Sequence, residues 1–253
     1  MHCYTEALEV NPKDVEAMYG ISEIHFGLQN LDLAEVQLRQ LLEVDPKHTQ
    51  ALIFMGDIYR YRDAFKLAPG ETAKMSGEVV YYYKEALDSD PTNVFACSSL
   101  GNYYTLLQEY DLAMFTFDAC LKESPTSEVL ILGMAELYKH KREFETCLSW
   151  AQKAMLVDYT QAHPYAVMGE CALFADQSVK AMNALLKACQ FDKGNEMYPL
   201  LFLEAVRSNQ SLPPDEILRI MHSLDLQGYS SHVTREFKHL LDEVSQRLNR
   251  DEL

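Results

Sequence analysis

Small and apolar residues recur along the chain at a nearly constant interval. One column of positions advances by 34, 45, 34, 34 and 34 residues and reads Ala7, Leu41, Ala86, Cys120, Ala154 and Ala188. A second column keeps the same intervals and is mostly glycine: Ser22, Gly56, Gly101, Ala135 and Gly169. Two helices can approach closely only where small residues lie between them. Columns that recur in register therefore predict one helical hairpin for each interval.

Four prolines divide these hairpins from one another. Pro12, Pro46, Pro91 and Pro125 end the similar phrases EVNP, EVDP, DSDP and KESP. Proline is tolerated in the first turn of a helix because a residue there does not need its N–H. Each proline thus marks the point where one helix has ended and the next begins, although the later intervals lack it.

These features resemble the tetratricopeptide repeat, a 34-residue unit with Leu-Gly and Tyr in its first helix and Ala, an aromatic residue, Ala and Pro around its second. One copy fits closely, with Leu100, Gly101, Tyr104, Ala113, Phe117, Cys120 and Pro125. The resemblance covers about residues 1–195 and implies an all-α fold, a right-handed α-solenoid of antiparallel helix pairs. It divides the chain into a half repeat at 1–12 and units at about 13–46, 47–91, 92–125, 126–159 and 160–193.

The two ends depart from the repeat. Residues 196–253 are expected to form a C-terminal helical cap, in which an apolar stripe on the last helix seals the final repeat: Val233, Phe237, Leu240, Leu241, Val244 and Leu248. At the other end, Met1 to Val10 supplies a second helix without its first. This indicates an upstream segment absent from the chain, a partner that caps the helix, or a frayed terminus.

The 45-residue interval holds 11 extra residues between the two helices of the unit at 47–91. Residues 61–67 are expected to lengthen its first helix and 72–75 to begin its second helix early, so that the insertion forms a protruding arm. Added loop length costs little entropy. The arm is interpreted either as a partner contact through Arg62, Phe65 and Lys66 or as a neutral surface insertion.

In tetratricopeptide repeats the first helices line a concave groove, and the resemblance carries the groove-facing positions onto this chain. The candidate partner-binding residues are Glu16, Glu23, Asp57, Asn102, Glu136, His163 and Glu170. Two columns of groove-facing positions hold ten residues in total, of which five are carboxylates and none is lysine or arginine. This favours a basic peptide as the ligand. Neighbouring positions add apolar Tyr19 and Ile53 together with Arg60 and Lys139, so a mixed groove is expected. The alternative is an ordinary solvated face of an acidic protein.

Composition narrows the function classes. The chain has 38 acidic and 22 basic residues and a net charge of -16, which disfavours nucleic acid as a ligand. No apolar run approaches the roughly 20 residues of a membrane-spanning helix. Six scattered cysteines without a C-x-x-C pair suggest neither a disulfide framework nor a zinc site, and they favour a reducing compartment. We therefore expect the cytoplasm or nucleus, with the lumen of the endoplasmic reticulum as an alternative because the chain ends in RDEL.

No phosphate loop, metalloprotease motif or nucleophile elbow occurs in the sequence, so neither catalysis nor a cofactor is expected. The leading hypothesis is a scaffold or adaptor in a multiprotein complex that binds a protein or peptide in its groove. Two alternatives remain: a structural subunit that stacks through its ends, or the regulatory repeat segment of a larger enzyme.

Overall fold

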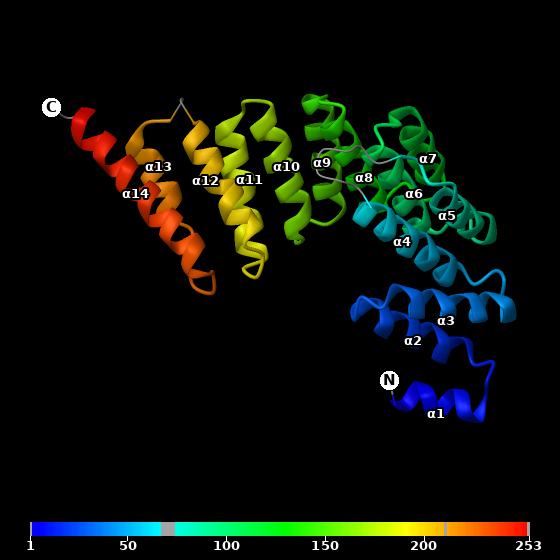
Figure 1. Ribbon diagram of the computed structural model, residues 1–253. Coiled ribbons are helices and arrows are strands. Elements are labelled where there is room, and N and C mark those ends of the chain that lie inside the picture. Colours follow the sequence, from blue (N-terminus) through cyan, green and yellow to red (C-terminus); the bar gives the residue numbers. More distant parts are fainter. Residues whose placement is uncertain (1, 67–73, 210–211, 252–253) are drawn as a thin grey trace. The chain divides into compact units, whose positions relative to one another are not determined.

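The computed structural model describes residues 2–66, 74–209 and 212–251, and every regular element in these ranges is an α-helix (Figure 1). The all-α prediction is therefore confirmed. The chain divides into two compact units, Met1–Leu130 and Ile131–Leu253. In each unit most of the helices pack against a helix next to them in sequence.

The first unit begins with a single helix and continues with helix pairs. Its helices are α1 (His2–Val10), α2 (Val15–Gly27), α3 (Leu31–Val44), α4 (Thr49–Lys66), α5 (Gly77–Ser89), α6 (Val94–Leu106) and α7 (Tyr110–Glu123). Asp14 and Asn93 cap α2 and α6, since each side chain accepts a hydrogen bond from the backbone N–H three residues later.

The second unit contains most of α8 and the helices that follow it. These helices are α8 (Glu128–His140), α9 (Phe144–Val157), α10 (Ala162–Phe174), α11 (Ser178–Phe191), α12 (Met197–Ser208), α13 (Pro214–His222) and α14 (Ser231–Asp251). Buried Val233, Phe237, Leu240 and Val244 form one stripe along α14, which packs on α12 and α13.

The glycine column has a steric origin. A Cβ atom at Gly56 would lie 2.5 Å from the ring of Tyr83, and one at Gly101 would lie 2.5 Å from the ring of Phe117. Both rings belong to the second helix of the same hairpin and are fully buried. The column of small residues therefore marks the places where the two helices of each hairpin touch.

The insertion lengthens only the first of the two helices beside it. The helix α4 has 18 residues, whereas α2 and α6 have 13 each, so the predicted extension beyond Arg60 is present. The predicted early start of the second helix was wrong at Lys74 and Met75, because α5 begins at Gly77. Residues 67–73 lie outside the described part. The backbone N–H of Ser76 donates to the Tyr103 hydroxyl at 2.8 Å, which ties the returning chain to α6.

The cysteines depart from the sequence-based expectation. The structure joins Cys97 of α6 to Cys120 of α7, and Cys147 of α9 to Cys171 of α10, with Cα separations of 6.4 and 6.0 Å. Such separations suit disulfides. The expectation of no disulfides was wrong for these four residues, because residues far apart in sequence meet on facing helices. Unpaired thiols therefore no longer support a reducing compartment.

Candidate protein-binding surface

The predicted groove positions of the first unit gather on one face of α2 and α4. Glu16, Tyr19 and Glu23 follow helical spacing on α2, and Asp57 lies on α4 one turn after Phe54, which was not a predicted position. Burial raises the pKa of Tyr19, and the negative charges of Glu23, Asp57 and Glu16 raise it further. The three carboxylates therefore act on one tyrosine. We call these five residues the acidic–aromatic face.

An aromatic cluster underlies this face. The ring of Phe54 lies 5.9 Å from that of Tyr19 and 5.0 Å from that of Phe26, and Tyr61 lies 5.8 Å from Phe26. All four side chains are partly exposed. Phe26, Phe54 and Tyr61 were not among the residues that the sequence indicated. Phe26 and Phe54 lie three residues from the predicted positions Glu23 and Asp57, so helical spacing could have indicated them. Tyr61 reaches the cluster only because α4 is longer than α2 and α6.

Asp57 is the least exposed carboxylate of the face. The Tyr83 hydroxyl donates to it at 2.7 Å, and the Arg60 guanidinium lies 3.4 Å away. Burial, followed by the negative charge of Asp57, raises the pKa of Tyr83. Asp57 is thus held in place from the second helix of its own repeat, while Glu16 and Glu23 are exposed to solvent.

Asn102 occupies the equivalent position of α6. Its side chain is exposed, and its amide nitrogen donates to the Ser98 hydroxyl at 3.2 Å. Because α4 and α6 pack against each other, Asn102 extends the same row of first-helix positions. Its carbonyl oxygen is an acceptor that a peptide backbone N–H can use.

In the second unit, one lysine neutralises much of the predicted negative charge. Lys139 lies 2.6 Å from the carboxylate of Glu136 and 2.7 Å from that of Glu170, and its side chain is only 16% exposed. Burial opposes the charge of Lys139, but its hydrogen bonds to both carboxylates outweigh that effect and raise its pKa. His163 is exposed near the start of α10. The second unit therefore offers less negative potential than its carboxylates alone suggest.

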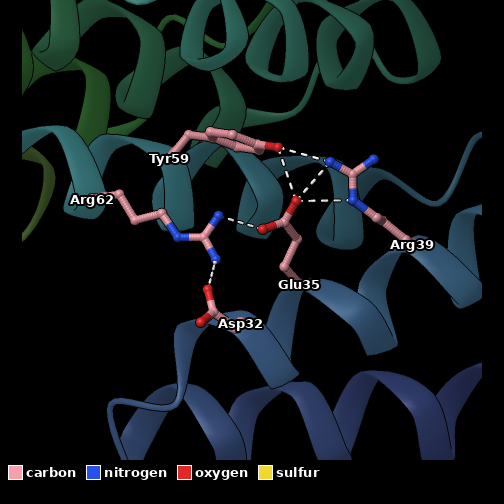
Figure 2. A network of polar contacts seen from close by, with 5 residues as sticks. All are labelled: Asp32, Glu35, Arg39, Tyr59 and Arg62. Carbon is pink, nitrogen blue, oxygen red and sulfur yellow. Dashed lines mark hydrogen bonds and ion pairs between the residues drawn. The ribbon is translucent and has the colours of Figure 1, made fainter.

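The arm residue Arg62 belongs to a polar network between α3 and α4 (Figure 2). Its guanidinium donates to Asp32 at 2.5 Å and to Glu35, and it lies over the ring of Tyr59. Glu35 also accepts from Arg39 and from the Tyr59 hydroxyl at 2.9 Å. Arg62 thus links two successive repeats.

Two other arm residues, Phe65 and Lys66, end α4, and their side chains lie outside the described part. In the ranges that the structure covers, no helix is long and apolar enough to cross a membrane. Over the same residues, no three metal-ligating side chains come together.

Comparison with known proteins assigns the family. A tetratricopeptide repeat family model matches residues 15–48 and 96–127, which contain α2–α3 and most of α6–α7. This chain is a tetratricopeptide repeat protein. Its sequence is 25% identical over 186 residues to BBSome complex member BBS4 of Bos taurus, and the match covers 73% of this chain and 33% of BBS4. The chain thus spans about a third of the length of that relative.

Solved structures share the fold of this tetratricopeptide repeat protein. PilW, a widely conserved type IV pilus biogenesis factor, has a TM-score of 0.66 at 15% identity, and the match covers 90% of this chain and 98% of PilW. The APC/C hetero-tetramer Cut9–Hcn1 has a TM-score of 0.66 at 13% identity, with 94% of this chain and 45% of that chain covered. At these identities the likeness shows the fold alone.

Proposed function

We propose that this tetratricopeptide repeat protein is a non-catalytic scaffold that binds a basic peptide or helix on the acidic–aromatic face of α2 and α4. The observation that carries the proposal is the placement of exposed Glu16 and Glu23 on either side of Tyr19, above a cluster of aromatic rings. Exposed carboxylates attract lysine and arginine and form charge-assisted hydrogen bonds with them. Partly exposed aromatic rings add apolar contact area and cation–π attraction.

The two units are expected to contribute unequally. Glu16 and Glu23 are exposed, whereas Glu136 and Glu170 share the partly buried ammonium of Lys139. A basic ligand would have to compete with Lys139 for those two carboxylates. We therefore assign the main recognition of positive charge to the first unit.

Membership of a larger complex is consistent with the relatives. BBS4 is named as a complex member, and Cut9–Hcn1 is a hetero-tetramer of APC/C. An alternative, a structural subunit that stacks through its ends, is supported by the exposure of Tyr4 and Val10 on α1, where no residue is buried. Sedimentation of the purified chain separates the two, because only end-to-end stacking predicts assemblies that grow with concentration and break when Val10 is replaced by Asp.

Selection from a displayed library of random 12-residue peptides tests the proposed face. We expect the wild-type chain to enrich sequences with lysine or arginine beside apolar residues. Glu16→Gln/Glu23→Gln should lose them, because both substitutions keep size and remove charge. A matched control, Glu204→Gln/Glu216→Gln, removes two exposed carboxylates of the second unit and should retain them. Enrichment of sequences without basic residues, or equal retention by both variants, would rule out this face.

A further inference from the structure

The first unit exposes large apolar residues on a second surface. Val36 of α3, Tyr81 of α5 and Phe115 of α7 are 47%, 56% and 76% exposed. They are separated by 45 and 34 positions, the intervals of the repeat, so they occupy the same place in three successive second helices. Leu33 and Leu112 lie one turn earlier on α3 and α7 and are exposed as well. We call these five residues the outer stripe.

The outer stripe is not part of the core. On α5 the buried residues are Val79, Tyr83 and Ala86, and Tyr81 lies about 200° around the helix from the first two. The next two intervals lead to Ser149 and Asn183 in the second unit, both polar and exposed. The repeat itself therefore does not require an apolar residue at this position. Exposed apolar residues that recur in register indicate a binding surface.

The aromatic part of the outer stripe is held rigidly. Tyr81 packs edge-on against Tyr82 at 5.2 Å, and Tyr82 stacks on Tyr59 at 5.5 Å. The Tyr59 hydroxyl in turn donates to Glu35. Beside Tyr81 a cavity of about 370 Å³ is lined by residues of both α3 and α5, among them Arg39 and Leu42. A side chain from a partner can therefore enter between these helices without first ordering the tyrosines.

The charges around the outer stripe select the partner. Each of the helices α3, α5 and α7 exposes more carboxylates than basic side chains. The whole chain carries a net charge of -16, so a second copy of this chain would be repelled at this surface. Basic side chains on either side of an apolar strip would instead match it.

We propose that the outer stripe binds an amphipathic helix with leucine or phenylalanine on one face and lysine or arginine at its edges. A helix presents such a strip through residues spaced three and four apart. A helix of about 13 residues is roughly 20 Å long, which is enough to contact side chains on more than one of these second helices. The surface lies on second helices and is separate from the acidic–aromatic face on the first helices, so both can be occupied together.

The probe is a fluorescein-labelled 18-residue amphipathic peptide of leucine and lysine, titrated with purified protein and followed by fluorescence anisotropy. The titration is made in the Glu16→Gln/Glu23→Gln background, which removes two charges of the acidic–aromatic face, and there we expect Val36→Ser/Tyr81→Ser/Phe115→Ser to raise Kd at least tenfold. The matched control, Leu156→Ser/Phe174→Ser/Phe191→Ser, changes three exposed apolar residues of the second unit and should leave Kd within twofold. Circular dichroism first confirms equal helicity of all three proteins.

Several outcomes overturn the proposal. Equal binding by the wild type and the outer-stripe variant would show that the peptide is held elsewhere. A leucine–glutamate peptide that binds as tightly would remove the charge complementarity on which the proposal depends. Loss of binding in Glu16→Gln/Glu23→Gln, with binding retained by the outer-stripe variant, would place the peptide on the acidic–aromatic face. Concentration-dependent dimers of the wild type that the outer-stripe substitutions abolish would make the occupant a second copy.

Discussion

Glu35 and Asp32 both pair with Arg62, yet replacing them should have very different consequences. The side chain of Glu35 is 14% exposed, whereas that of Asp32 is 96% exposed. Glu35→Gln keeps the shape but removes the charge, and its amide N–H₂ would face three donors: Arg39, Tyr59 and Arg62. Asp32→Asn removes an equal charge in open solvent. The two substitutions therefore compare a largely buried carboxylate that accepts from three side chains with an exposed one that pairs with Arg62.

The magnitudes follow from the contacts. A hydrogen bond to a charged group contributes about 1.5–3 kcal/mol, and leaving a buried charge unpaired costs more. Since glutamine retains one acceptor, we expect Glu35→Gln to lower the free energy of unfolding of the first unit by about 2–3 kcal/mol. An exposed ion pair contributes about 0–1 kcal/mol, so Asp32→Asn should lower it by less than about 0.5 kcal/mol.

The pH dependence provides a second readout. Burial alone would raise the pKa of Glu35, but hydrogen bonds from Arg39, Arg62 and Tyr59 outweigh it, and the net shift is downward. A lowered pKa in the folded state means that the contribution is present above the unfolded value of about 4.3 and is lost as pH falls through the folded pKa. The difference between wild type and Glu35→Gln should therefore narrow below about pH 4.

Native-state hydrogen exchange of the α3 and α4 amides is the suitable assay, because the two units need not unfold together. Urea unfolding followed by circular dichroism supports it. If Glu35→Gln and Asp32→Asn shift protection equally, or if Glu35→Gln costs less than about 0.5 kcal/mol, the network is a surface feature and burial does not strengthen it.

Three further results are expected. Gly101→Ala should lower the free energy of unfolding by about 1–3 kcal/mol in thermal unfolding, because its Cβ would meet the ring of Phe117. Gly27→Ala, whose Cβ would have nothing within 4 Å, should be neutral or stabilising. Equal effects of the two substitutions would contradict the close approach of the helices at Gly101. Tyr83→Phe removes the donor to Asp57 and should cost about 1 kcal/mol in urea unfolding, and no loss would mean that water replaces it. Reducing the two disulfides, which join positions 23 and 24 residues apart, should lower the free energy of unfolding by roughly 3 kcal/mol for each bond. Titration of the unreduced, denatured chain should find two free thiols, and a result of six would disprove both disulfides.

The helix pairs could be predicted because local pattern and long-range packing coincide in this fold. The interval between Gly56 and Gly101 is enough to identify both the helix contacts and the insertion, since each glycine faces its own hairpin partner. The start of α5 could not be read from 72–75, because Ser76 is positioned by a tyrosine of the following repeat. Helix ends that depend on such tertiary contacts have no local signal.

The candidate site was predicted only in part. Sequence placed Glu16, Glu23 and Asp57 on one face, and the structure brings them around Tyr19. The sequence also placed Lys139 among the groove positions, but it did not indicate that this lysine pairs with both Glu136 and Glu170. Pairing across repeats depends on the distance between side chains of different helices, which the spacing of one chain does not contain.

The two disulfides differ in what they join, and this has a mechanical consequence. Cys97 and Cys120 lie within one hairpin, whereas Cys147 and Cys171 connect the second helix of one repeat to the first helix of the next. Under tension applied at the chain ends, the residues enclosed by each bond cannot extend. At about 3.4 Å per residue, roughly 160 Å of contour length is withheld in total. An assembly that pulls on this scaffold would stretch it less when oxidised, and the second bond would keep two neighbouring repeats together after their other contacts had separated.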